Sequence, residues 1–191
     1  EMTSSLVGSE MCIRDRIKGK QGEIYIKEVD IMLYIFLADG FEETEAVAPA
    51  DVIKRAGLEV KFVGVDGELV CGAHNITVKT DCSEPDYSDI SGVILPGGMP
   101  GTLNLQKNKM VTDAIEYCVK NEKLVAAICA APMILGDLGY LDGKDAVCFP
   151  GFEDSLTESN ILSDGVVRDG NFITAKGAGK ALEFGAAIAV S

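Results

Sequence analysis

The stretch that decides the fold runs from Met32 to Val65 and reads MLYIFLADGFEETEAVAPADVIKRAGLEVKFVGV. Its first seven residues, Met32–Ala38, form an unbroken apolar run, as expected of a strand buried on both faces of a parallel sheet. An amphipathic stretch at Glu43–Ala56 predicts a helix that ends at Gly57, and Glu59–Val65 predicts the next strand. Strand, helix and strand in this order make a β-α-β unit, so the sequence predicts an α/β fold.

Beyond Val65 the same alternation continues, and glycine or proline marks most of the joins. Strands are predicted at Gly92–Leu95, Leu124–Ile128 and Ala146–Phe149, helices at Lys109–Asn121, Ala130–Leu138 and Ala178–Val190, a hairpin or meander at Leu69–Thr80 and a hairpin at Val166–Ala175. At 191 residues, of which 47% are apolar, the chain has material for one buried core. We therefore expect one α/β domain on a mostly parallel sheet covered by helices on both faces.

The two ends of the chain do not follow this pattern. Residues 1–20 show no sustained period of a strand or a helix, and Lys18–Val29 predicts one short strand at most. We interpret residues 1–31 as an extension outside the domain that need not be native, and residues 32–191 as the domain. The chain stops at Ser191 directly after an apolar run without a capping glycine, so we expect that a C-terminal piece of the domain is missing.

Composition excludes several classes of function. A net charge of −13 without a basic cluster repels phosphate backbones, so no nucleic-acid partner is expected. The six cysteines show no CxxC pairing and lie in apolar segments, which favours reduced thiols, and a single histidine makes a metal site unexpected. No run approaches about 18 apolar residues and no signal peptide is readable, so we expect a cytoplasmic protein without a membrane partner.

One segment carries the pattern of a reactive cysteine. In Leu124–Leu135 (LVAAICAAPMIL) an apolar strand runs into Cys129, small alanines flank it, and a helix is predicted directly afterwards. A sharp strand-to-helix turn of this kind is a nucleophile elbow with sulfur as the nucleophile. The helix N-terminus would favour the thiolate and lower the pKa of Cys129. The alternative is that Cys129 is buried simply as a small apolar residue.

Two further segments follow predicted strands and therefore lie at the same carboxyl edge of the sheet. In Asp39–Glu45 (DGFEETE), a carboxylate buried beside the sulfur could move a proton, or the acids could only complement the helix that they open. The spacing of these acids does not show which of the two roles holds, or which acid would move the proton. The glycines of Pro96–Gly101 (PGGMPG) would let backbone N–H groups approach an oxyanion, although a plain tight turn explains them equally well. His74 is by default an exposed polar residue.

Taken together, these motifs closely resemble the DJ-1/ThiJ/PfpI superfamily, in its DJ-1-like branch. The resemblance runs from Met32 to the end and rests on DGFEETEAV at Asp39–Val47, LPGG at Leu95–Gly98, AAICAAP at Ala126–Pro132 and TAKGAG at Thr174–Gly179 with EFG at Glu183–Gly185. It implies a flavodoxin-like three-layer sandwich, related to the class I glutamine amidotransferase fold, that forms a homodimer.

The resemblance also implies roles for single residues. Cys129 matches the nucleophile, and Glu45 matches the glutamate that hydrogen-bonds to its sulfur. Gly98 and Ala130 match the backbone donors of an oxyanion site. Arg55 and His74 fall where some members direct polar side chains toward the partner subunit's site.

Two departures narrow the expected activity. Ala130 stands where the peptidase-like members have a histidine, and Phe149 stands where the animal deglycases have another, so a Cys–His hydrolytic couple is missing. We expect a cofactor-independent enzyme of the glyoxalase or deglycase type, acting on glyoxal, methylglyoxal or their early protein adducts. The alternative is a redox-sensing or chaperone-like stress protein that uses an oxidisable Cys129, and a cysteine peptidase or amidase ranks below both.

Overall fold

The computed structural model describes residues 16–18, 24–26 and 31–191, and the chain divides into two units, Glu1–Asp30 and Ile31–Ser191. In the first unit, β1 (Arg16–Lys18) pairs antiparallel with β2 (Ile24–Ile26). The sequence predicted at most one short strand there, because three-residue strands are too short to show a period. The other predictions for the first 31 residues lie outside the described residues.

The second unit is built on a six-stranded sheet with the strand order β11-β12-β8-β7-β3-β4. Its strands are β3 (Met32–Leu37), β4 (Glu59–Gly64), β7 (Ile90–Leu95), β8 (Leu124–Ile128), β11 (Val166–Asp169) and β12 (Phe172–Ala175). All neighbours pair in parallel except β11, which pairs antiparallel with β12. The predicted mostly parallel sheet is therefore confirmed.

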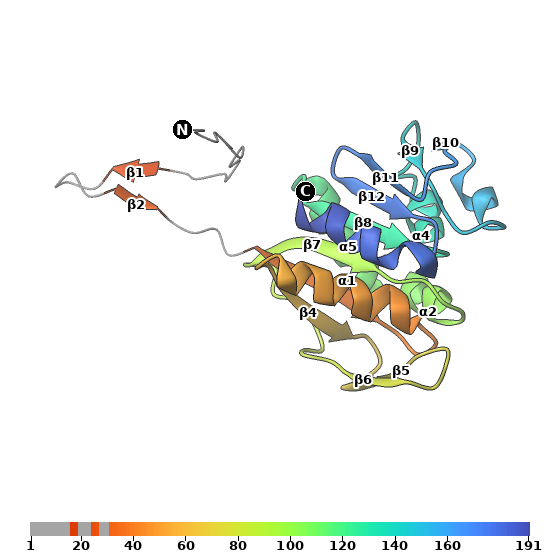
Figure 1. Cartoon of the computed structure of the whole chain (residues 1–191), viewed down its shortest axis with the longest axis horizontal. Coiled ribbons are helices and arrows are strands. Elements are labelled where there is room, and N and C mark those ends of the chain that lie inside the picture. Colours follow the sequence, from red (N-terminus) through yellow and green to blue (C-terminus); the bar gives the residue numbers. More distant parts are fainter. Residues whose placement is uncertain (1–15, 19–23, 27–30) are drawn as a thin grey trace, which may run out of the picture. The chain divides into compact units, whose positions relative to one another are not determined.

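Helices cover both faces of this sheet, which gives three layers (Figure 1). On one face α1 (Glu43–Arg55) packs beside α5 (Ala181–Ala189). The other face carries α2 (Gly101–Lys107), α3 (Lys109–Lys120) and α4 (Pro132–Asp137). Within the described part of the chain, no helix is long and apolar enough to cross a membrane.

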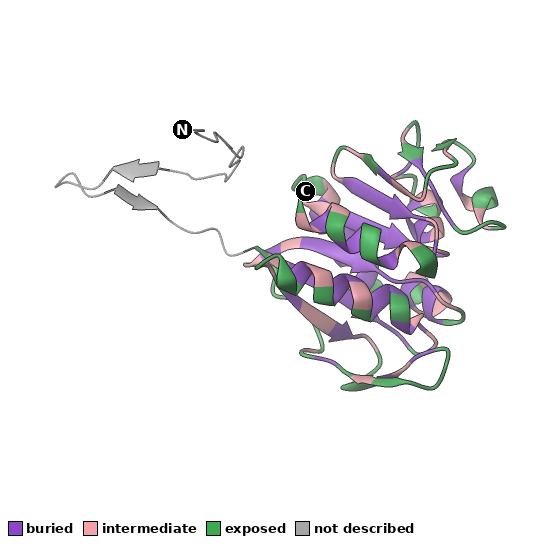
Figure 2. Ribbon diagram, viewed as in Figure 1, coloured by how far each residue is buried: buried purple, intermediate pink, exposed green. Residues whose placement is uncertain are grey.

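The unbroken apolar strands explain why both faces are covered. Along β3, Leu33 and Ile35 join the core beneath α1 and α5, whereas Tyr34 and Phe36 join the core beneath α3 and α4. Successive side chains of a strand point to opposite faces, so an apolar run supplies both cores at once. In Figure 2 the central strands are accordingly purple, the colour of buried residues.

Several predicted boundaries change in the structure. The helix predicted from Ala130 begins at Pro132, and the final helix begins with a 3-10 turn at Ala178–Lys180. The strand predicted at Ala146–Phe149 shrinks to β9 (Asp145–Ala146), which pairs with β10 (Asn160–Ile161) outside the main sheet. Its later N–H groups have other acceptors: that of Val147 donates to the Thr174 hydroxyl at 2.9 Å.

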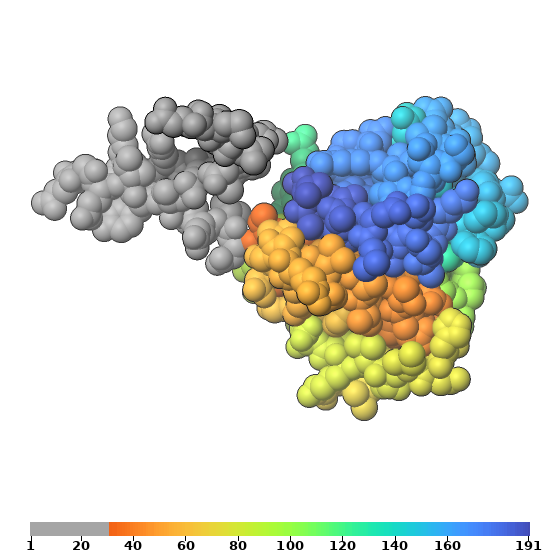
Figure 3. All heavy atoms as spheres, viewed as in Figure 1, coloured from red at the N-terminus to blue at the C-terminus, as the bar shows by residue number. Residues whose placement is uncertain are grey.

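The predicted hairpin at Leu69–Thr80 is confirmed as β5 (Leu69–Cys71) and β6 (Thr77–Lys79), which form a two-stranded sheet of their own. Its turn lies against the entry to α1. The Ala73 N–H donates to the Phe41 carbonyl at 2.8 Å, and the Gly40 N–H donates to the Cys71 carbonyl at 2.8 Å. In Figure 3 the yellow atoms of this hairpin directly adjoin the orange atoms of that segment.

Candidate active site

The carboxyl ends of four parallel strands, β3, β7, β8 and β12, deliver the segments that surround Cys129. The residue follows β8 directly and has a φ of +64°, a left-handed conformation that costs a non-glycine residue about 1–2 kcal/mol. Its N–H donates to the Ala175 carbonyl and its carbonyl accepts the Phe149 N–H, both at 2.8 Å. Neighbouring segments thus hold Cys129 on a sharp turn, the elbow that the sequence predicts.

Glu45 is the acid that lies at this sulfur. It stands in the first turn of α1 with 1% of its surface exposed, and its carboxyl group lies beside the Cys129 side chain. Its Oε2 also accepts the Gly97 N–H at 2.9 Å. The structure therefore brings together Cys129 and Glu45, which the sequence associated only through the family resemblance.

Two glycines after β7 allow this close approach. A Cβ atom added at Gly97 would lie 2.6 Å from the Cys129 Cβ and 2.6 Å from the Glu45 Oε2, so no larger residue fits between them. Gly98 has a φ of +91°, which favours glycine. The Gly98 and Ala130 N–H groups lie near enough to the Cys129 sulfur to act on its pKa. Their role as donors to an oxyanion stays a prediction.

Burial and the interaction between the two side chains set the pKa values of Glu45 and Cys129. Burial raises the pKa of Glu45 to about 7, and the Glu42 charge acts in the same direction. Burial and the ionised Glu45 carboxylate raise the pKa of Cys129 to about 12, while the Ala130 and Gly98 N–H groups act to lower it. The ionised Glu45 carboxylate thus raises the pKa of Cys129, whereas the Cys129 side chain acts to lower the pKa of Glu45, so the two groups titrate as a coupled pair.

This finding corrects the expected source of thiol activation. The sequence predicted that a helix N-terminus lowers the pKa of Cys129, but α4 has only six residues and starts at Pro132. The positive end of such a short helix is outweighed by burial and by the carboxylate. The sulfur therefore keeps its proton at neutral pH, beside the Glu45 carboxyl group.

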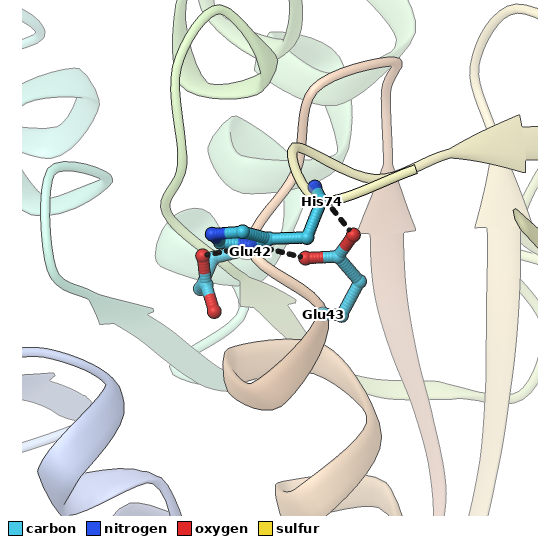
Figure 4. Close-up of side chains that lie close together, drawn as sticks. All are labelled: Glu42, Glu43 and His74. Atoms are coloured by element: carbon cyan, nitrogen blue, oxygen red, sulfur yellow. Dashed lines mark hydrogen bonds and ion pairs between the residues drawn. The ribbon is translucent and has the colours of Figure 1, made fainter. Parts of the chain in front are cut away.

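Glu42, Glu43 and His74 form a second cluster at the start of α1 (Figure 4). The buried Glu43 accepts hydrogen bonds from the His74 backbone N–H at 2.8 Å and from its ring Nδ1 at 2.9 Å, and Glu42 lies 3.4 Å from the same nitrogen. Burial acts to raise the pKa of Glu43, but the hydrogen bonds from His74 outweigh it and hold this pKa below its usual value. The hydrogen bond that the His74 Nδ1 donates to Glu43 raises the pKa of His74 in return.

This cluster gives Glu43 a role that sequence spacing did not suggest. It anchors the β5–β6 turn to α1, because Oε1 lies so close to Gly72 that a Cβ added there would be 2.2 Å away. The three side chains offer ligand atoms within 4.8 Å of one another, the arrangement that a metal ion requires. Both Glu43 oxygens already accept hydrogen bonds from His74, so the cluster is satisfied as a hydrogen-bonded anchor.

Arg55 lies at the other end of α1 and pairs with Asp51 at 2.7 Å. Ten residues of helix separate it from Glu45, a rise of about 15 Å. Within one subunit Arg55 is therefore not part of the Cys129 site, and His74 joins the cluster at the helix start. The expectation that both reach a partner subunit's site stays a prediction.

Residues that the sequence did not place at the site also line it. A Cβ added at Gly177 would lie 3.2 Å from the Phe149 ring and 3.9 Å from the Glu45 Oε1, so these three residues are neighbours. The Ala178 N–H hydrogen-bonds to Glu45. The TAKGAG motif contains Gly177 and Ala178, but no local sequence pattern shows that this motif contacts Glu45, which is distant in the chain.

Comparison with known proteins agrees with this geometry. The profile of the DJ-1/PfpI family matches residues 32–190. Protein dj-1beta of Drosophila melanogaster is 36% identical over 162 residues, which cover 81% of this chain and 86% of the fly protein. The crystal structure of the fly protein superposes with a TM-score of 0.79 and 34% identity, covering 84% of this chain and 89% of the other.

Two archaeal relatives extend the comparison. A protein named as a deglycase in Pyrococcus abyssi is 29% identical over 147 residues, covering 74% of this chain and 87% of its own. An uncharacterised protein of Methanocaldococcus jannaschii is 30% identical over 190 residues and covers 96% of this chain and 90% of its own. That second match is longer than residues 32–191, so it reaches into the segment before Met32. The matched profile and the fly relative show that the chain belongs to the DJ-1/PfpI family.

Proposed function

We propose that this chain is a cofactor-independent enzyme of the glyoxalase or deglycase type, which converts small reactive carbonyl compounds, or their early adducts on proteins, into hydroxy acids. The observation that carries the proposal is the close approach of Cys129 and the buried Glu45 beside Gly97, with the N–H groups of Gly98 and Ala130 near the sulfur. A P. abyssi relative that is named as a deglycase supports the same class of reaction.

The first step is addition of the sulfur to the aldehyde carbon. As the C–S bond forms, the proton of the pair passes through Glu45 to the new oxyanion, which gives a hemithioacetal. The Gly98 and Ala130 N–H groups face the sulfur and are placed to stabilise this oxyanion. A base with a pKa of about 7 suits this transfer at neutral pH, because it is ionised often enough to accept a proton and basic enough to hold one.

In the second step the Glu45 carboxylate removes the proton from the former aldehyde carbon and returns it to the neighbouring carbon. The carbonyl group moves to the carbon that bears sulfur, so the product is a thioester. Water then cleaves the thioester, which releases the hydroxy acid and regenerates the thiol. Glyoxal would give glycolate and methylglyoxal would give lactate, without an external oxidant or reductant.

The pattern of thiol burial keeps a redox-sensing function as the second candidate. Cys129 is partly exposed, whereas Cys118 and Cys148 are buried. Burial raises the pKa of all three thiols, so their exposure is what distinguishes them. Cys129 is therefore the better placed of these three thiols to meet an oxidant. A peptidase lacks support, because the one histidine of the sequence, His74, is hydrogen-bonded to Glu43.

The two candidates differ in turnover. Purified protein is incubated with an excess of glyoxal or methylglyoxal, and glycolate or lactate is quantified. Many products per subunit in the wild type, none in Cys129→Ser and wild-type turnover in the control Cys71→Ser would support the enzyme. Consumption of one aldehyde per subunit, at the rate of a free thiol, would contradict the enzyme and support the sensor.

A further inference from the structure

Phe149 is an aromatic residue that remains half exposed beside the catalytic pair. Its exposed fraction is 46%, although its backbone is fixed by the hydrogen bond from its N–H to the Cys129 carbonyl. The buried apolar residues of this domain form two cores, and Phe149 belongs to neither of them. Filling a core therefore does not explain its large apolar side chain.

The ring lies close to the atoms that react. A Cβ added at Gly177 would lie 3.2 Å from the ring carbon Cδ2 of Phe149 and 3.9 Å from the Glu45 Oε1. No side chain of Gly177 separates the ring from the carboxylate. A molecule bonded to the Cys129 sulfur and within reach of Glu45 would therefore lie beside the face or edge of Phe149.

A second aromatic residue supports the ring. Phe152 packs against Phe149 edge to face, with ring centroids 6.5 Å apart and an interplanar angle of 66°. The Phe152 N–H also donates to the Phe149 carbonyl at 3.2 Å. Such aromatic pairs restrict each other's orientation, so the apolar surface beside Cys129 is partly fixed before a substrate arrives.

We propose that Phe149 is a specificity-determining residue whose ring forms an apolar wall of the Cys129 site and selects 2-oxoaldehydes with an apolar substituent over glyoxal. This inference rests on the proposed function and adds the substrate class to it. The reacting carbonyl groups of glyoxal and of substituted 2-oxoaldehydes use the same sulfur, carboxylate and N–H groups. Only the substituent differs, and an apolar substituent is removed from water when it contacts the ring.

The effect of the Phe149 ring is measured by comparing, between variants, the ratio of kcat/KM for phenylglyoxal to kcat/KM for glyoxal. The values of kcat/KM for phenylglyoxal and glyoxal are compared in the wild type, Phe149→Ala, Phe149→Leu and the control Leu69→Ala, which changes an exposed apolar residue of β5. Phe149→Ala should lower the phenylglyoxal-to-glyoxal ratio about tenfold, as expected for loss of one apolar contact, and Phe149→Leu should restore part of it. Leu69→Ala should leave the ratio unchanged.

A ratio in Phe149→Ala within about twofold of the wild-type ratio would overturn the inference while leaving the enzyme in place. A second measurement decides the inference even if no 2-oxoaldehyde is turned over, an outcome that would overturn the proposed function alone. Alkylation of Cys129 by N-benzyl iodoacetamide and by iodoacetamide is followed by mass spectrometry. A preference for the benzyl reagent that falls about tenfold in Phe149→Ala supports the wall, and an unchanged preference excludes it.

Discussion

At the scale of single residues, the account depends on one proton shared by Cys129 and Glu45. The two side chains lie beside Gly97, where an added Cβ would be 2.6 Å from both the Cys129 Cβ and the Glu45 Oε2. Removing the carboxylate should therefore damage the reaction more than removing any neighbouring acid. This separates proton transfer from a general effect of negative charge at the start of α1.

Glu45→Gln should lower kcat for methylglyoxal about 100-fold or more, which is the usual contribution of a positioned acid or base. Glu42→Gln is the matched control, because it removes one carboxylate of the same helix start that does not hydrogen-bond to the sulfur. The measurement is steady-state turnover with both variants folded, as judged by circular dichroism. Equal losses in the two variants would mean that the acids act only through their charge.

Glu45 should also make stability depend on pH. Burial raises its pKa from 4.5 to about 7, so between these values the folded chain keeps a proton that the unfolded chain has released. Wild-type stability therefore falls as pH rises through this window, with a contribution of about 3 kcal/mol at most. Glutamine does not ionise, so the variant lacks this loss. The melting temperature of Glu45→Gln minus that of the wild type should therefore increase from about pH 5 to about pH 8. A difference that is constant with pH would contradict the raised pKa.

The sequence pattern alone identified some residues of this site but not others. Cys129 is recognisable because its turn imposes a local pattern of a strand, small neighbours and proline. The choice of Glu45 among four nearby acids came from the family resemblance, since spacing alone does not show which one meets the sulfur. The direction of the Cys129 pKa was wrong because it depends on the burial of the sulfur in the folded chain and on a carboxylate from a distant segment.

At the scale of elements, the long strands and helices were predictable and the short pieces were not. Apolar strands such as β3 and β8 and the amphipathic α1 and α3 carry clear periodic signals. By contrast, α2 is a seven-residue helix that follows a proline- and glycine-rich turn, and its pattern was hidden by those turn residues. The end of β9 is set by side-chain and elbow contacts, which no local pattern encodes.

The contact between α1 and the β5–β6 turn yields a prediction at this scale. Glu43→Ala should reduce the free energy of unfolding by about 1–3 kcal/mol, because it leaves the His74 N–H and ring without their buried acceptor. Hydrogen exchange of the His74 and Ile76 amides should accelerate, because the Ile76 N–H also donates to the Glu43 Oε1, at 3.4 Å. Glu42→Ala, which removes only a 3.4 Å ion pair with His74, should change neither. Unchanged exchange at both amides in Glu43→Ala would show that the turn does not depend on this anchor.

At the scale of the whole molecule, the sheet, both cores and the site lie within Ile31–Ser191. The sequence predicts a domain over residues 32–191, because its periodic pattern starts at Met32. It could not decide the origin of the preceding segment, and the M. jannaschii relative aligns into it. The contribution of that segment is therefore a question for experiment.

Deletion of residues 1–31 should leave activity unchanged and the melting temperature within a few degrees of the full chain. The reason is that the described residues of both cores and of the Cys129 site all lie in Ile31–Ser191, and that residues 1–20 show no sustained period of a strand or a helix. Both proteins are compared by calorimetry and by turnover of methylglyoxal. A large drop in melting temperature on deletion would show that the segment is part of the folding unit.

The central claim is that Glu45 carries a proton from one substrate carbon to the next, and a single isotope measurement tests it most directly. When methylglyoxal is converted in deuterium oxide, a carboxyl group that exchanges its proton with solvent should place deuterium on the carbon that bears the lactate hydroxyl. Mass spectrometry and nuclear magnetic resonance of the isolated lactate locate the label. The account predicts deuterium at this carbon in the wild-type product; lactate without deuterium there, or no catalytic lactate at all, would contradict it.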